Sequence, residues 1–184
     1  MSLVLIVVAV AALILLIFIW SVYNRLIAAR NIVHEAFSGI DVQLKKRFEL
    51  IPNLIEAVKG YNTHEAQVLQ EIVAARSASG GNVNEMSDND ASITGALKQF
   101  RVQVEAYPDL KANVQFLDLM KNLSSVENEL AMARRYYNGA VRDLNTKIQL
   151  FPAVLFAGML GFRAETFYKV EDEQREAHSI NLKD

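Results

Sequence analysis

The sequence predicts an all-α protein in which an N-terminal transmembrane helix is followed by an antiparallel, up-and-down four-helix bundle and a short C-terminal tail. An unbroken apolar run occupies residues 3–20. Apolar residues then recur every three or four positions along most of the chain, as they do in helices that pack on helices. Glycine and proline are scarce, with 8 and 3 among 184 residues. We expect an anchor over 1–24, a bundle over 25–162 and a charged tail over 163–184.

The apolar run has the length of a membrane span. About 18 residues at a rise of 1.5 Å give roughly 27 Å, close to the hydrocarbon core of a bilayer. A cleaved signal peptide needs a basic N-terminal region and a small-residue cleavage site. Only Met1 and Ser2 precede the run, and it ends in aromatic residues. We therefore expect an uncleaved anchor, with Trp20, Tyr23 and Arg25 at the membrane interface.

The orientation of the anchor follows from the basic residues around it. No Lys or Arg precedes the run, whereas Arg25 and Arg30 follow it closely. The positive-inside rule then predicts that the N-terminus lies outside and that the rest of the chain lies in the cytoplasm. The chain has no cysteine, which is compatible with a reducing compartment.

Four amphipathic stretches follow the anchor, over 26–51, 54–75, 93–107 and 110–151. Helices of roughly 28, 26, 20 and 40 residues would form a bundle whose last helix returns toward the membrane. Residues 77–90 are polar and contain glycine, so we expect a loop in which Asp88 or Asp90 caps the next helix. A second break is expected at Tyr107-Pro108-Asp109. Pro52 is compatible with a kink in one long helix or with a turn between two helices.

Residues 153–162 are apolar but too few to span a bilayer. They are expected to lie in the membrane interface, to pack under the bundle, or to contact another subunit. The candidate contact residues are Phe151, Leu155, Phe156, Met159, Leu160 and Phe162. Within the tail, Phe167, Tyr168 and Ile180 are candidates for docking onto the bundle.

Charge and motifs exclude several functions. The formal net charge of −2 argues against a nucleic-acid binder, which needs a basic excess. None of the three histidines, His34, His64 and His178, follows a Glu by three positions, so the di-metal motif of helical bundles is missing. Neither a phosphate-binding glycine loop nor a nucleophile elbow occurs. We therefore expect no metal, no cofactor and no catalytic residues.

Several polar residues have competing interpretations. The basic groups Lys45-Lys46-Arg47 and Arg134-Arg135 are expected to form a solvated face or interhelical ion pairs, with Glu127, Glu129 and Asp143 available near Arg134 on the same helix. Amides along the apolar stripes are expected to find partners and so to fix helix register; these are Asn53, Asn138 and Asn145.

Two alternative functions stay open. One is an enzyme with a polar site around His64, Glu65 and Arg134, which requires a concave pocket and a perturbed titratable group. The other is a lipid or peptide carrier with a groove between helices, lined by Phe37, Phe100 and Phe116.

Two stretches are more specific than composition: IDVQLKKRFELIPNLIEAVKGYNTHE (40–65) and ENELAMARRYYNGAVRDLNTKIQLFPAVLFAGMLGF (127–162). Together with the N-terminal anchor and YNRLIAARN (23–31), they closely resemble the bacterial LemA family. The resemblance implies a single-pass inner-membrane protein with a soluble four-helix bundle in the cytoplasm, and it supplies no catalytic residues. We expect a self-associating scaffold or adaptor whose partners are the lipid bilayer and further copies or other membrane proteins.

Overall fold

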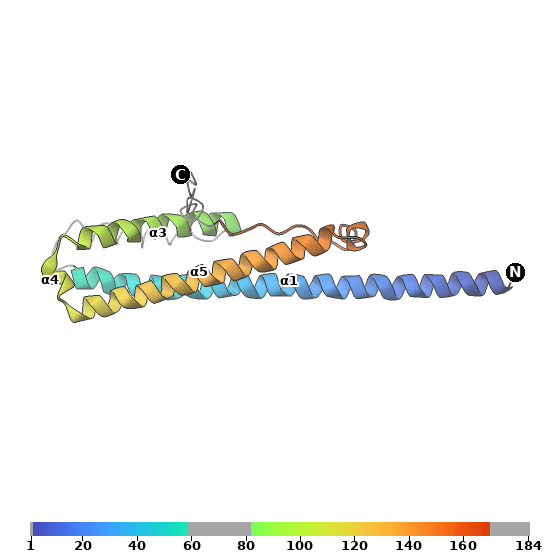
Figure 1. Cartoon of the computed structure of the whole chain (residues 1–184), viewed down its shortest axis with the longest axis horizontal. Helices are drawn as coiled ribbons and strands as arrows, with labels where there is room; N and C mark the ends of the chain where they lie inside the picture. The colour runs from blue at the N-terminus through green and yellow to red at the C-terminus, as the bar shows by residue number, and fades with distance from the viewer. Residues whose placement is uncertain (1, 59–81, 170–184) are drawn as a thin grey trace, which may run out of the picture. The chain divides into compact units, whose positions relative to one another are not determined.

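The computed structural model describes residues 2–58 and 82–169. Within these ranges the chain is helical and contains no β-strand (Figure 1). The helices are α1 (Ser2–Val58), α3 (Val83–Val104), α4 (Pro108–Lys111) and α5 (Val114–Gln149), followed by the short 3₁₀ helix η1 (Ala153–Leu155). The all-α class and the N-terminal apolar helix are confirmed. The antiparallel four-helix arrangement stays a prediction, because most of the second amphipathic stretch lies outside the described residues.

The chain divides into two compact units. The first unit contains Met1–Gly39 and Arg135–Phe167, and the second contains Ile40–Arg134 and Tyr168–Asp184. Helices α1 and α5 each contribute residues to both units. The anchor and bundle boundary expected near residue 24 falls inside α1, where the helix continues without a break.

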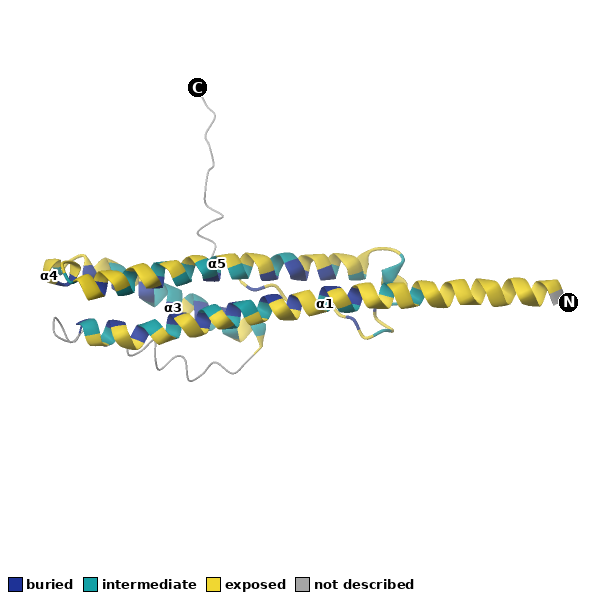
Figure 2. Cartoon of the chain, turned by 90° about the horizontal axis from the view of Figure 1, so that it is seen from below, coloured by how far each residue is buried: buried dark blue, intermediate teal, exposed yellow. Residues whose placement is uncertain are grey.

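Helix α1 changes character along its length. Its apolar N-terminal part is exposed on all sides, and buried positions begin only after Trp20 (Figure 2). From there a stripe of buried residues recurs every three or four positions, beginning with Leu26, Ala29, Val33 and Ala36. The first part therefore contacts little of the chain itself, and the second part packs as an amphipathic helix.

Pro52 lies inside α1, so a turn at this position is wrong. Proline removes one hydrogen bond of the helix and has a low propensity for helix interiors. Ile51, Leu54 and Val58 on either side of it are fully buried in the core of the second unit. The burial of these side chains offsets the cost of proline and keeps the segment helical.

Helix α3 begins earlier than the sequence predicts. Asn82 Oδ1 accepts hydrogen bonds from the backbone N–H groups of Asn84 and Glu85, at 3.0 and 3.1 Å. This is an N-cap, and the helix begins at Val83. A loop over 83–90 is therefore wrong, as is capping by Asp88 or Asp90; residues 77–81 lie outside the described range.

The predicted break at Tyr107-Pro108-Asp109 is confirmed. Tyr107 has a non-helical backbone, and Pro108 occupies the first turn of α4. The last amphipathic stretch was expected to form one helix from residue 110, and this is wrong. Asn113 caps α5, because its Oδ1 accepts hydrogen bonds from the N–H groups of Gln115 and Phe116. The long helix therefore starts at Val114.

The second unit has its apolar core between α1, α3 and α5. Phe100 and Phe116 meet edge to face, with ring centroids 6.4 Å apart. Both rings are almost fully buried, so these two side chains fill the core and do not line an open groove. Phe37 belongs to the first unit, where its ring contacts Tyr137.

Candidate functional site

The first candidate region lies in the first unit, where the loop after α5 meets α1. Residues Trp20, Tyr23 and Arg25, expected at a membrane interface, are exposed on α1. Their interfacial position stays a prediction. Ala157 and Phe162 of the loop are buried against Leu26 of α1. Part of the 153–162 stretch therefore packs against the chain itself, which was one of the three placements that the sequence left open.

Phe162 is held between two side chains of α1. Its ring lies edge-on to the Tyr23 ring, with centroids 5.8 Å apart, and the Arg30 guanidinium lies 5.2 Å from its centroid. Tyr23 and Arg30 are seven positions apart, so they lie on one face of the helix. Phe162, which was expected to contact the membrane or another protein, therefore packs against α1 of the same chain.

The loop ends in a Schellman motif. The Phe162 N–H donates to the Ala157 carbonyl at 2.9 Å, and the Gly161 N–H donates to the Gly158 carbonyl at 3.2 Å. Gly161 has φ +80°, the left-handed conformation that this motif requires. The motif reverses the chain and directs Phe162 back to α1.

The other apolar side chains of the loop are uncovered. Phe151 and Met159 are 79% and 86% exposed, and Leu155 is exposed as well. Phe156 and Leu160 are half-buried. We use the term apolar loop face for the exposed apolar residues of this segment: Leu150, Phe151, Val154, Leu155 and Met159.

Residues 163–167 are tied to α5 by polar contacts. Asn145 Nδ2 donates to the Glu165 carbonyl at 2.9 Å, and the Glu165 N–H donates to Asn145 Oδ1 at 2.8 Å. The Tyr137 hydroxyl donates to the Thr166 carbonyl at 2.9 Å, and burial, followed by the negative charge of Glu165, raises the pKa of Tyr137. The expectation that an amide in an apolar stripe finds partners is confirmed for Asn145. Asn53, in contrast, is exposed.

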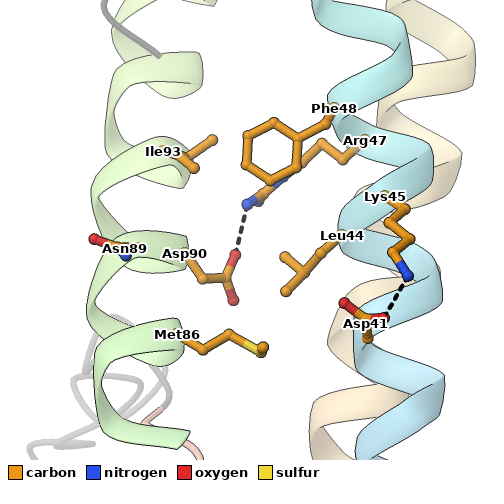
Figure 3. A pocket seen from close by; sticks show the side chains of 9 residues that line it. All are labelled: Asp41, Leu44, Lys45, Arg47, Phe48, Met86, Asn89, Asp90 and Ile93. Carbon is orange, nitrogen blue, oxygen red and sulfur yellow. Dashed lines mark hydrogen bonds and ion pairs between the residues drawn. The ribbon is translucent and has the colours of Figure 1, made fainter. Parts of the chain in front are cut away.

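The second candidate region is a group of buried and partly buried polar side chains in the second unit, here called the Asp90 cluster: Arg47, Asp90, Glu127, Arg134 and Tyr168. Arg47 Nη2 on α1 donates to Asp90 Oδ1 on α3 at 2.7 Å (Figure 3). Arg47 Nη1 also donates to Glu127 Oε1 at 3.2 Å. The Tyr168 hydroxyl donates to Asp90 Oδ2 at 2.7 Å, and Arg134 Nη2 forms an ion pair with the same oxygen at 2.5 Å. The Arg134 contact lies outside hydrogen-bonding geometry, so it acts through charge.

This cluster corrects the interpretation of the basic groups. Interhelical ion pairs are confirmed, but a solvated face is wrong for Arg47, which is fully buried. Arg134 pairs with Asp90 of α3 and not with the acidic residues of its own helix. Tyr168 docks as expected, while Phe167 is half exposed and Ile180 lies outside the described residues.

The burial of Asp90 was not predicted, because the sequence suggested this residue only as a helix cap, although a signal for burial was present. Residue 90 precedes Ile93, Leu97 and Phe100 with the spacing of one helix face. Extending the apolar stripe back by one turn places the Asp90 carboxylate toward the core. A buried carboxylate needs cationic partners, and Arg47 and Arg134 supply them.

The Asp90 cluster joins α1, α3, α5 and the segment that contains Tyr168 by ion pairs and hydrogen bonds. Two guanidinium groups and two carboxylates offset each other in formal charge. Both Asp90 oxygens are engaged by groups of the chain itself, so this carboxylate is poorly placed to accept a proton from a substrate. Burial, followed by the negative charge of Asp90, raises the pKa of Tyr168 above its ordinary value. The hydroxyl therefore stays protonated and keeps donating to Asp90.

The cavity beside the cluster is small. It has about 190 Å³ and is lined by Asp41, Leu44, Lys45, Arg47, Phe48, Met86, Asn89, Asp90 and Ile93 (Figure 3). Pockets for small organic ligands usually have about 300–1,000 Å³. Within residues 2–58 and 82–169, no three His, Asp or Glu side chains gather as a metal site would require. His64 and Glu65 lie outside the described residues, and Arg134 is engaged with Asp90 and with the Tyr168 ring.

Comparison with known proteins agrees with the resemblance seen in the sequence. The family model described as the LemA family matches residues 36–182, a range that begins after the apolar run. A protein of Metamycoplasma hominis named Protein LemA is 31% identical over 135 residues. This match covers 70% of the present chain and 60% of that relative's length. The chain belongs to the LemA family.

Proposed function

We propose that this chain is a membrane-anchored scaffold or adaptor of the bacterial inner membrane. Residues 3–20 cross the bilayer once, the N-terminus lies outside, and the helical domain works in the cytoplasm through protein contacts and not through catalysis. One observation carries the proposal. An 18-residue window of α1 has a mean hydropathy of 3.4, and none of it is buried by the rest of the chain.

Two physical arguments support the anchor. The core helix of a soluble protein is covered by its neighbours, whereas this segment has no cover within the described chain. A removable signal sequence ends in a small-residue cleavage site, whereas the run over residues 3–20 ends in Phe18, Ile19 and Trp20. A bilayer supplies the apolar surroundings that such a surface needs.

The scaffold role is supported by the chemistry of the polar residues. The Asp90 cluster uses its charges to join segments of the chain to each other, and the cavity beside it is small. Tethering to a membrane raises the effective concentration of the domains, so modest contacts suffice for assembly. We therefore infer that the protein self-associates or binds other membrane proteins. Membership in the LemA family fits a membrane-associated helical protein.

The anchor and its orientation are tested by single-cysteine labelling, since the chain has no cysteine of its own. The variants are Ser2→Cys and, on the exposed surface of α3, Gln99→Cys. A membrane-impermeant maleimide applied to intact spheroplasts is expected to label the first variant and to reach the second only after lysis. The reverse pattern would contradict the orientation. Release of the protein by alkaline carbonate would contradict the span.

Self-association is tested by photocrosslinking in native membranes. Exposed apolar residues of α3 and α5 offer positions for a photoreactive side chain, for example Val102 and Met132. The exposed polar position Gln99 serves as a matched control on α3. We expect a dimer band or a reproducible heterologous product from at least one apolar position. A strictly monomeric pattern without reproducible neighbours would argue against a scaffold.

A further inference from the structure

The apolar loop face consists of large side chains that residues 2–58 and 82–169 leave uncovered. Phe151 and Met159 are the most exposed of them, at 79% and 86%. Ala157 and Phe162 of the same loop are buried, so the segment has one side that packs on α1 and another side that faces outward. An exposed apolar surface on a segment that is itself packed against the protein is typical of a site that contacts a membrane or another protein.

Charged residues flank this segment at both ends but are absent from within it. Residues 148–162 contain no charged side chain, while Lys147 precedes the stretch and Arg163 follows it. Apolar residues flanked by cations are typical of segments that lie at the surface of an anionic membrane. An interface between protein subunits would gain nothing from cations on both flanks unless the partner were acidic.

The loop packs against α1 directly after the apolar run. Its buried residues form one cluster with Leu26, against which Val22 and Ile27 also pack. Phe162 is held by Tyr23 and Arg30. With a rise of 1.5 Å per residue, Val22 and Leu26 lie about 3 and 9 Å along the helix from Trp20. The loop is therefore placed at the level where the apolar surface of α1 ends, and its position beside the helix is visible at the end of α5 (Figure 1).

We propose that the apolar loop face inserts into the membrane interface of the same leaflet from which α1 emerges. This inference rests on the proposed anchor. The occupant of the face is lipid, because the face continues the apolar surface of residues 3–20 and is flanked by Lys147 and Arg163. The stretch is too short to span, so it enters only the interfacial layer. The protein thus holds the membrane at two points, which fixes the rotation of α1 about its axis.

The test uses the full chain in nanodiscs of phosphatidylethanolamine and phosphatidylglycerol, with one chain per disc. An environment-sensitive fluorophore is attached to Met159→Cys in the loop. Two matched variants carry the same label on α1: Ala12→Cys within the apolar run and Ser38→Cys, an exposed position beyond it. Quenching is measured with lipids that carry a spin label either near the headgroup or near the chain end.

For Met159→Cys we expect blue-shifted emission and stronger quenching by the shallow spin label than by the deep one. Ala12→Cys should be quenched most by the deep label, and Ser38→Cys should report water. If Ala12 reports lipid but Met159 reports water, the loop proposal is overturned while the anchor stands. If Ala12 also reports water, the anchor itself has failed. Blue-shifted emission at Met159 without quenching by either lipid would assign the face to a protein contact and would likewise overturn the proposal.

Discussion

Arg47 on α1 and Asp90 on α3 form a hydrogen-bonded ion pair of 2.7 Å whose side chains are 0% and 2% exposed. The other oxygen of the same carboxylate receives Arg134 of α5 and the Tyr168 hydroxyl of the C-terminal segment. Four segments of the second unit therefore meet at a single carboxylate. Such a group adds little net stability over well-packed apolar side chains, but removing one partner leaves a buried charge uncompensated.

The Asp90→Asn variant should be strongly destabilised. Asparagine keeps the size of the side chain but removes the negative charge, so two buried guanidinium groups lose their common partner. We expect a loss of about 3–5 kcal/mol in the free energy of unfolding. Denaturant unfolding of the detergent-solubilised chain, followed by far-ultraviolet circular dichroism, measures it.

Asp88→Asn is the matched control for this change. Asp88 lies in the same helix and forms an ion pair with Lys169 at 2.7 Å, but both side chains are 60% exposed. Exposed pairs contribute about 0–1 kcal/mol, so this variant should unfold almost like the parent. Similar losses in the two variants would show that burial does not distinguish the two carboxylates.

The Tyr168→Phe variant should change how stability depends on pH. Burial, followed by the charge of Asp90, raises the pKa of Tyr168. Above about pH 10, the ordinary pKa of tyrosine, the unfolded chain releases this proton while the folded chain retains it. The unfolded state then binds fewer protons, so the free energy of unfolding falls as the pH rises. Phenylalanine does not titrate, and the variant should lose less stability than the parent between pH 9 and 11.

The same variant should be less stable than the parent at neutral pH, because it lacks the hydrogen bond to the Asp90 carboxylate. Hydrogen bonds to charged groups contribute about 1.5–3 kcal/mol. Unfolding midpoints measured from neutral pH through the alkaline range give both quantities. An alkaline loss in Tyr168→Phe as steep as that of the parent would refute the assignment of this titration to Tyr168.

The helical class and the apolar run could be read from the sequence because both depend on local patterns. The start of α3 could not, since residues 83–90 are mostly polar and resemble a loop. Their helix is stabilised by the Asn82 cap and by Asp90, whose partners Arg47 and Arg134 lie far away along the chain. Local composition carries no information about such distant partners.

Contacts between residues far apart in the sequence also determine the helix at Pro52 and the position of Phe162. Proline disfavours a helix interior, but the burial of Ile51 and Leu54 overrides this preference. The apolar character of residues 153–162 was evident from the sequence. That Phe162 alone of the expected contact residues fits between Tyr23 and Arg30 depends on tertiary packing.

The Asn145→Ala variant should loosen residues 163–167 from α5. It removes both hydrogen bonds to the Glu165 backbone and leaves that N–H and carbonyl without this partner. We expect a loss of about 1–3 kcal/mol in the free energy of unfolding. Tryptic cleavage after Arg163 should also become faster under native conditions. Asn53→Ala, at an exposed position of α1, should change neither measurement; unchanged cleavage in Asn145→Ala would mean that this amide does not hold the segment.

Gly161 and Gly158 allow the geometry of the apolar loop to be tested by a matched pair of substitutions. A Cβ atom added at either position meets no atom within 4 Å, so neither alanine variant clashes. Only Gly161 has a positive φ, of 80°, which an L-residue adopts at a cost of about 1–2 kcal/mol. Gly161→Ala should therefore lose about that much stability, while Gly158→Ala should stay close to the parent.

The loss in Gly161→Ala should be accompanied by displacement of Phe162. The left-handed residue allows the Phe162 N–H to reach the Ala157 carbonyl, and the same reversal places the ring between Tyr23 and Arg30. Hydrogen exchange of the Phe162 amide, measured by NMR, should be faster in Gly161→Ala than in Gly158→Ala. If both variants exchange this amide at the rate of the parent, the positive φ is not what holds the loop on α1. Faster exchange in Gly161→Ala alone would show that the left-handed backbone at Gly161 holds Phe162 against α1.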